Sequence, residues 1–144
     1  MNEMHHRFDS TTLDDVIWKK IPVVNDLRGN LAFIQKPELG WDFKRVYYLF
    51  DIPSGATRGG HAHKQQSELI IALSGSFDIK LHDGRHQQTY TLNRPDRGLL
   101  IPNGIWRELE NFSANAICLV LNTHYFDEAD YIRDFDRFRE LKKL

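Results

Sequence analysis

The sequence has a single cysteine, Cys118, among its 144 residues, so no intrachain disulfide can form. Its place in the apolar run 116–121 predicts a small core residue, and a lone thiol fits a reducing compartment. No stretch approaches the roughly 20 apolar residues that span a membrane, and the first residues contain no apolar signal core. We therefore expect a cytoplasmic protein that does not bind membranes.

The chain also has almost no net charge: 19 basic and 20 acidic residues give −1. This balance argues against a protein that attracts nucleic acid over its whole surface, although it permits a local basic pocket. There is no internal repeat or low-complexity tract. The length suits one domain, and we expect a single domain over residues 1–144.

Short β-like segments recur along the chain with no helical pattern between them. Phe77, Ile79 and Leu81 alternate with polar residues, as in a half-exposed antiparallel strand. Turn formers over 25–30 predict a hairpin near the start. The other candidate strands are 16–24, 31–35, 44–50, 69–73, 87–92, 98–101, 105–109 and 116–122. This spacing indicates an all-β sandwich or barrel rather than a parallel α/β sheet.

One of these strands has two different faces. Arg45 and Tyr47 share one face, because alternate residues of a strand point the same way. The opposite face carries Val46, Tyr48 and Phe50 and is the more apolar. We expect that apolar face to pack against a second sheet.

The end of the chain changes to helical spacing. Asp127 is a candidate N-cap, and Tyr131, Phe135 and Phe138 recur at helical intervals. The pattern predicts one amphipathic helix over about 127–143, with its aromatic face packed against the barrel or a partner subunit.

The densest chemistry lies in residues 58–75. His61 and His63 are two apart, so on an extended segment both imidazoles project from one face and share a cavity. Glycines just before the pair permit a tight turn, and Arg58 adds a permanent positive charge. The segment predicts a site at the mouth of a β-enclosure.

The spacing of Gly55, His61, His63, Glu68 and Gly75 resembles the first motif of the cupin superfamily. This resemblance implies a small jelly-roll barrel. It also brings the two histidines and the glutamate to one site.

The second cupin motif is matched from Gly98 through 102–104 to Arg107. Arg107 stands where cupins usually keep their last metal-binding histidine, and a guanidinium has no lone pair for a metal. We therefore predict no metal and no other cofactor. Two imidazoles can instead take and return protons near neutral pH. Grouped with Arg58 and Lys64, Arg107 also suits a phosphate-bearing ligand.

Four strings extend the likeness to one family: 44–48, 58–64, 98–99 with Trp106, and 125–133. In order and spacing, over about residues 18–138, the chain resembles the nucleotide-sugar 3,4-ketoisomerases, cupins that act on dTDP-4-keto-6-deoxyglucose. The resemblance implies a metal-independent isomerase and a homodimer that exchanges N-terminal strands. Its 3-keto product would pass to an aminotransferase that makes 3-amino sugars for surface glycans such as lipopolysaccharide O-antigen.

The resemblance also implies roles for individual residues. His61 is expected to be the base, His63 its partner, and Tyr47 an active-site group near the sugar. The residues expected to bind substrate are Arg45, Arg58, Lys64, Trp106 and Arg107.

The chain departs from the family pattern at two places. The family commonly has Trp-His-Glu where this chain has Trp106, Arg107 and Glu108, and a glutamate where it has Ser67, with Glu68 one step along. A one-residue shift on a strand moves a side chain to the opposite face. Two other functions therefore stay open: a non-catalytic sugar-nucleotide-binding cupin, and a related nucleotide-sugar epimerase.

Overall fold

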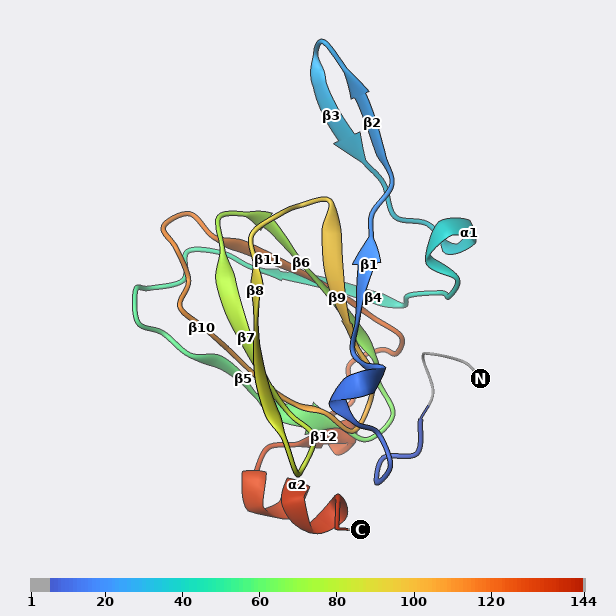
Figure 1. Cartoon of the computed structure of the whole chain (residues 1–144), viewed down its shortest axis with the longest axis vertical. Coiled ribbons are helices and arrows are strands. Elements are labelled where there is room, and N and C mark those ends of the chain that lie inside the picture. The colour runs from blue at the N-terminus through green and yellow to red at the C-terminus, as the bar shows by residue number, and fades with distance from the viewer. Residues whose placement is uncertain (1–5, 144) are drawn as a thin grey trace.

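The computed structural model of the chain describes residues 6–143 and has two five-stranded sheets that face each other as a sandwich (Figure 1). The first sheet has the order β1 (Ile17–Lys20), β9 (Arg97–Ile101), β6 (Glu68–Ser74), β11 (Ile117–Asn122) and β4 (Arg45–Leu49). The second has the order β12 (Tyr131–Ile132), β5 (Arg58–His63), β10 (Trp106–Glu110), β7 (Phe77–His82) and β8 (Gln87–Leu92). Neighbouring strands are antiparallel in both sheets. The predicted all-β jelly roll is confirmed, as an open sandwich rather than a closed barrel.

The core lies between the sheets and is built by alternate residues of the strands. On β7, Phe77, Ile79 and Leu81 are buried and the residues between them are partly exposed, which confirms the predicted alternation. Ile70 and Val120 of the facing sheet belong to the same cluster. Full burial of such side chains contributes roughly 1.5–3 kcal/mol each, so this shared core holds the two sheets together.

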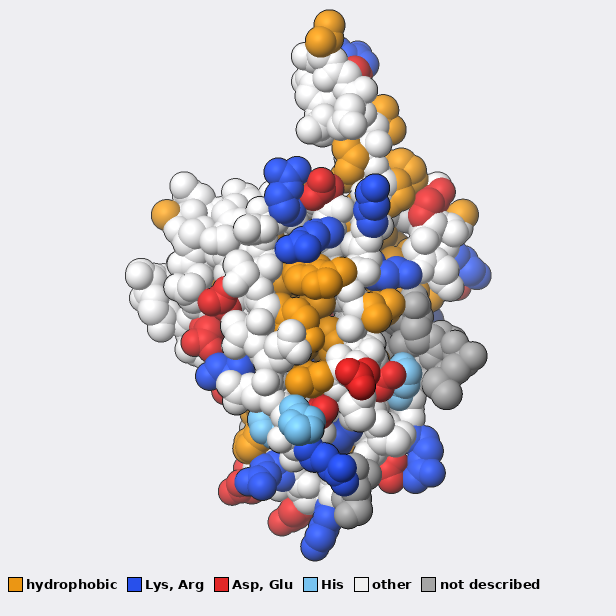
Figure 2. Space-filling model, viewed as in Figure 1, with side chains coloured by type: hydrophobic (Ala, Val, Ile, Leu, Met, Phe, Trp, Pro, Cys, Tyr) orange, Lys and Arg blue, Asp and Glu red, His pale blue; other side chains and the backbone are white. Residues whose placement is uncertain are grey.

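A hairpin formed by β2 (Val23–Asp26) and β3 (Gly29–Ala32) projects away from the sandwich (Figure 1). The sequence predicted a hairpin here, but with one long first strand over 16–24. Pro22 divides that strand because it has no N–H to donate, so β1 pairs with β9 while β2 pairs with β3. Leu27 is fully exposed at the hairpin, and Figure 2 shows hydrophobic side chains uncovered along it.

The helical elements are short. They are η1 (Leu13–Asp15), α1 (Lys36–Leu39), η2 (Glu128–Asp130) and α2 (Phe135–Leu141). No helix in the described part of the chain is long and apolar enough to cross a membrane.

The predicted helix over 127–143 is wrong in extent, because the segment is interrupted by a strand. Asp127 does cap a helical turn, but that turn is the three-residue η2. The strand β12 follows and pairs Tyr131 with His63 of β5. Asp134 then caps the α-helix α2, which ends at Leu141. Pairing with β5 therefore competes successfully with helix formation in this segment.

The aromatic face of α2 packs against the sandwich, as predicted. Phe138 is completely buried, with its ring centroid 5.8 Å from that of Trp106 and 5.9 Å from that of Phe8. Aromatic pairs at this separation add to the free energy of burial. The helix thus joins the outer surface of the second sheet to the N-terminal segment.

The two faces of β4 are the reverse of those predicted. Arg45 and Tyr47 point into the sandwich, whereas Val46, Tyr48 and Phe50 are 47%, 60% and 60% exposed. Inside the sandwich, Arg45 Nη2 donates a hydrogen bond to Gln66 and the Tyr47 hydroxyl donates one to Glu68, and these bonds offset part of the cost of burying the two side chains. The apolar set is left on the outer surface.

Candidate active site

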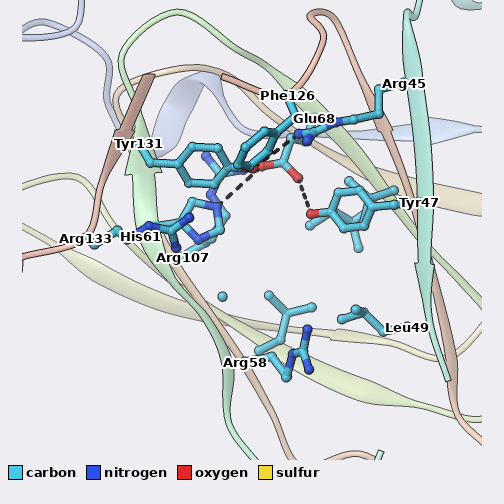
Figure 3. Close-up of a pocket in the computed structure, with 14 residues that line it drawn as sticks. Arg45, Tyr47, Leu49, Arg58, His61, Glu68, Arg107, Phe126, Tyr131 and Arg133 are labelled. Atoms are coloured by element: carbon cyan, nitrogen blue, oxygen red, sulfur yellow. Dashed lines mark hydrogen bonds and ion pairs between the residues drawn. The ribbon is translucent and has the colours of Figure 1, made fainter. Parts of the chain in front are cut away.

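A cavity of about 310 Å³ lies between the sheets and opens to solvent (Figure 3). Its walls come from β4, β5, β6, β10 and β11 and from the segment between β11 and α2. The side chains and glycine that line it are Arg45, Tyr47, Leu49, Arg58, Gly59, His61, Glu68, Ile70, Arg107, Leu109, Val120, Phe126, Tyr131 and Arg133. The structure thus brings together five predicted site residues: Arg45, Tyr47, Arg58, His61 and Arg107.

The two histidines of β5 lie together but are not equivalent. Their ring centroids are 4.8 Å apart. His61 lines the cavity, whereas His63 is completely buried behind it and does not line it. The prediction that both imidazoles share the cavity is therefore wrong for His63. The strand β12 pairs with β5 at this point, and the Tyr131 ring covers the His63 ring at a centroid distance of 4.4 Å.

Glu68 is the centre of the polar contacts at the cavity wall. Its Oε1 lies 2.6 Å from Arg107 Nη1 and 2.8 Å from His63 Nε2, and its Oε2 accepts a hydrogen bond from the Tyr47 hydroxyl at 3.1 Å. Figure 3 shows Tyr47 and Glu68 directed toward each other across the cavity. Glu68 and Arg107 are both buried, so this ion pair is shielded from solvent.

These contacts fix the protonation of two groups. Burial alone would raise the pKa of Glu68, but the charges of Arg107 and His63 outweigh it and hold the pKa well below its usual value. Burial and the neighbouring Glu68 charge raise the pKa of Tyr47 far above its usual value. At neutral pH the wall therefore presents an ionised carboxylate and a protonated phenol that donates to it.

His61 has the properties of a neutral base. Burial lowers its pKa to about 4, so its imidazole carries no charge at neutral pH. Its Nε2 has no hydrogen-bond partner among the described residues and lies 3.9 Å from Glu68 Oε1. A neutral imidazole at the wall of the cavity is suited to accept a proton from a bound substrate.

Arginine side chains surround the open part of the cavity. Arg45 donates hydrogen bonds to Gln66 and to the Tyr131 hydroxyl, both at 3.2 Å. Arg133 stacks on the Tyr131 ring and is mostly exposed, as is Arg58. Guanidinium groups bind phosphate oxygens in bidentate geometry, so this rim suits a phosphorylated ligand.

Sequence reasoning missed four site residues in one segment: Phe126, Asp130, Tyr131 and Arg133. The segment was read as the start of a helix, because its aromatic residues happen to recur at helical intervals. A signal was nevertheless present, since 125–133 was among the strings that resembled the family. In the structure this segment forms one wall of the cavity.

Two predicted residues lie outside the cavity. Trp106 points away from it and packs on Phe135 at a centroid distance of 5.2 Å, because Arg107, its neighbour on β10, points inward. Lys64 is exposed beyond the end of β5. The same alternation explains the family departure at residue 67: Ser67 accepts a hydrogen bond from the Asn103 backbone N–H, and Glu68 supplies the carboxylate to the cavity.

His61, His63 and Glu68 could each offer one ligand atom to a metal, and these atoms lie within 4.8 Å of one another. The donor set does not fit a divalent cation, however, because Arg107 holds its guanidinium 2.6 Å from Glu68 Oε1. A metal bound there would face a permanent positive charge at close range.

Comparisons with known proteins give a consistent result. The family model described as FdtA: WxcM-like, C-terminal matches residues 14–143. The chain is 39% identical over 116 residues to TDP-4-oxo-6-deoxy-alpha-D-glucose-3,4-oxoisomerase of Aneurinibacillus thermoaerophilus, covering 80% of this chain and 84% of that protein.

Two solved structures are similar over nearly the whole chain. A variant of the 3,4-ketoisomerase QdtA from Thermoanaerobacterium thermosaccharolyticum, in complex with TDP-4-keto-6-deoxyglucose, has a TM-score of 0.88 and 35% identity, covering 92% of this chain and 96% of that one. The TDP-quinovose 3,4-ketoisomerase WlaRB of Campylobacter jejuni has a TM-score of 0.84 and 40% identity, covering 89% and 99%.

Proposed function

Because the chain belongs to the FdtA family of WxcM-like C-terminal domains, we propose that it is a sugar-nucleotide 3,4-ketoisomerase whose substrate is TDP-4-keto-6-deoxyglucose. The observation that carries the proposal is the neutral His61 imidazole, which lines the same cavity as Tyr47 and Arg107. A proton acceptor, a proton donor and a cation are the groups that a carbonyl shift between adjacent carbons requires.

The reaction moves two hydrogens within one molecule and needs no external oxidant or reductant. The C4 carbonyl acidifies the C3–H bond, and His61 Nε2 accepts that proton while the bonding electrons form a C3–C4 double bond and O4 becomes an oxyanion. The hydroxyl on C3 then gives its proton to O4 and becomes the new carbonyl. As it does so, the double-bond electrons take a proton from His61 at C4. The sum is a 3-keto isomer of the substrate.

The surrounding groups are placed to assist these steps. The Tyr47 hydroxyl can move the proton between O3 and O4, because burial keeps it protonated and Glu68 orients it. The Arg107 guanidinium lies at the cavity wall, where its charge favours the enediolate. A positioned acid or base contributes about 10² to 10⁴ in rate. The rim arginines Arg45, Arg58 and Arg133 suit the diphosphate of the substrate.

A homodimer is part of the proposal. The outer face of the first sheet carries Tyr48, Phe50 and Leu73, which are 45–60% exposed and border an open apolar hollow of about 520 Å³. The projecting hairpin adds the exposed Val24 and Leu31. Contiguous apolar surface of this kind is typical of protein interfaces. A second copy that covers this face and exchanges the hairpin would bury both features.

The proposed product also places the protein within a reaction sequence. A 3-keto sugar nucleotide is the substrate type for an aminotransferase, which would convert it to a 3-amino-3,6-dideoxy sugar. Such sugars belong to surface glycans, including lipopolysaccharide O-antigens, and their nucleotide-linked precursors are used in the cytoplasm.

Proton NMR in deuterated buffer tests the proposed activity. The chelator-treated protein is incubated with TDP-4-keto-6-deoxyglucose, with a His61→Asn variant as the matched control. We expect deuterium at C4 and a 3-keto product with the native protein, and a rate lower by at least about 10² with the variant. If the native protein gives neither exchange nor product, even after metal ions are added, the isomerase proposal is wrong for this substrate.

A further inference from the structure

The cavity is charged on one side of Tyr47 and aliphatic on the other. Three residues of β4 face into it, in the order Arg45, Tyr47 and Leu49. Figure 3 shows Leu49 beyond Tyr47, on the side of the cavity away from Glu68. The lining therefore changes from charged to aliphatic along the direction of the strands.

Strand pairing extends this division across the first sheet. Arg45 and Glu68 stand level with each other, because both pair with the same residue of β11. Two residues along β11, Val120 pairs with both Tyr47 and Ile70. Residues two apart on a strand point to the same face, and Val120 and Ile70 line the cavity. The row beside the charged one thus consists of the tyrosine and two aliphatic side chains.

The second sheet completes the aliphatic wall beside His61. Leu109 lies two residues after Arg107 on β10 and also lines the cavity. Gly59 leaves a gap there, since the Cβ of any side chain in its place would lie 2.9 Å from Leu109 Cδ1 and 3.9 Å from His61 Cε1. The leucine and the imidazole therefore border the same space. Arg58 pairs with Leu109 in register, but it is exposed and belongs to the rim.

The aliphatic wall offers no hydrogen bond to a ligand. Ile70, Leu109 and Val120 are 1%, 5% and 1% exposed and belong to one core cluster, against which Leu49 packs. Their side chains contain neither a donor nor an acceptor. The strands that carry them, β6, β10 and β11, each have a neighbouring strand on both sides, so their backbone groups are engaged within the sheets.

The proposed reaction fixes which part of the sugar lies next to this wall. C3 and C4 must reach His61 and Tyr47. In the pyranose ring these two carbons are flanked by C2, which carries a hydroxyl, and by C5, which carries the C6 methyl group. One flank of the sugar is thus polar and the other apolar, as are the two sides of the cavity.

We infer that Ile70, Leu109 and Val120 form a subsite for the C6 methyl group, and that this subsite makes the protein selective for 6-deoxy sugars over sugars with a 6-hydroxyl. The 2-hydroxyl then faces the side of Arg45 and Glu68. That a TDP-sugar occupies the cavity rests on the proposed function, whereas the selectivity is a separate property of the wall.

The selectivity follows from the cost of burying a hydroxyl without a partner. A methyl group against this wall gains apolar contact, but a hydroxymethyl group loses its hydrogen bonds to water and finds none in exchange. Aliphatic sites discriminate against an added hydroxyl by up to about 10²-fold. We expect the preference for the 6-deoxy sugar to be about 10- to 10²-fold.

Equilibrium binding tests this inference without turnover. TDP-6-deoxyglucose and TDP-glucose differ only at the C6 hydroxyl, and neither contains the ketone, so neither can be isomerised. Titration calorimetry of the native protein with each compound gives the ratio of the two Kd values. Equal Kd values would overturn the subsite and leave the isomerase proposal standing. If neither compound binds, the inference and the proposed substrate class are both wrong.

A substitution in the wall tests which residues are responsible. Threonine has nearly the shape of valine and adds a hydroxyl, so Val120→Thr gives a 6-hydroxyl a partner. We expect the ratio of Kd values to fall about three- to tenfold in this variant. The matched control is Val46→Thr, the same change on the outer face of β4, where the side chain is 47% exposed; it should keep the native ratio.

An unchanged ratio in Val120→Thr, with thermal unfolding showing a folded protein, would exclude Val120 from the subsite and overturn the assignment. Should this variant fail to fold, the ratio measured with the native protein still decides whether the cavity selects for the 6-deoxy sugar.

Discussion

Arg107 occupies the position in the second cupin motif where a histidine is usual. Its contacts show the effect of having an arginine there. It pairs with Glu68 at 2.6 Å and also donates to the Ile105 carbonyl at 3.1 Å. A permanent cation thus pairs with one of the three groups that could each offer a ligand atom to a metal. The sequence identified this position as distinctive, but the partner of Arg107 depends on strand pairing and could not be read from spacing.

The buried pair predicts a large effect on stability. Replacing Arg107 with leucine leaves Glu68 without its strongest partner, so we expect the free energy of unfolding at pH 7 to fall by about 3–5 kcal/mol. Urea unfolding measures this difference. Arg94→Leu is the control, because Arg94 pairs with Asp96 at the exposed surface; it should leave the unfolding midpoint unchanged. Equal effects of the two substitutions would contradict the prediction.

The lowered pKa of His61 predicts how the free energy of unfolding depends on pH. Its pKa is about 4 in the folded chain and 6.5 by its ordinary value, so between these pH values the unfolded chain binds more protons. Stability should therefore fall as pH decreases from 6.5 toward 4, and His61 accounts for up to about 3 kcal/mol of that loss. His61→Asn should lose less stability over this range than the native protein, as measured by urea unfolding at pH 7 and pH 4.5. Parallel losses in both proteins would show that His61 does not titrate as described.

At the scale of elements, the positions of most strands could be predicted from the sequence. Which face of a strand is buried could be predicted for some strands and not for others. The alternation of β7 was read correctly because one of its faces is apolar and the other polar. For β4 the predicted buried face was wrong, because the apolar residues Tyr48 and Phe50 lie on the outside of the sandwich while Arg45 and Tyr47 lie inside. The sequence of β4 alone cannot reveal that Gln66 and Glu68 accept hydrogen bonds from Arg45 and Tyr47 inside the sandwich. Nor can it reveal that the apolar side chains of this strand lie on the outer surface.

The contact of α2 with the second sheet predicts a further loss of stability. Phe138 is completely buried among aromatic rings, so Phe138→Ala should lower the free energy of unfolding by about 3–5 kcal/mol, through lost burial and the cavity left behind. Chemical denaturation measures it. Arg139→Ala, on the exposed side of the same helix, should have little effect. A small effect of Phe138→Ala would mean that the helix does not contribute to the core.

At the scale of the whole molecule, an apolar sheet face and a projecting hairpin both lie open. The proposed dimer predicts that a charge on this face separates the subunits. Leu73→Arg should convert a dimer to a monomer in sedimentation equilibrium, because an unpaired charge would be buried at the interface. Thr89→Arg, at an exposed position of β8 on the other sheet, should leave the dimer intact. A Leu73→Arg protein that remains dimeric would place the interface elsewhere.

The segment that contributes Phe126, Tyr131 and Arg133 to the cavity comes late in the chain, after every other wall. During translation, β4, β5, β6, β10 and β11 all leave the ribosome before it does. A nascent chain therefore cannot present a finished cavity until the strand β12 has emerged and paired with β5. The wall of the cavity that Phe126, Tyr131 and Arg133 form is thus the last to be synthesised.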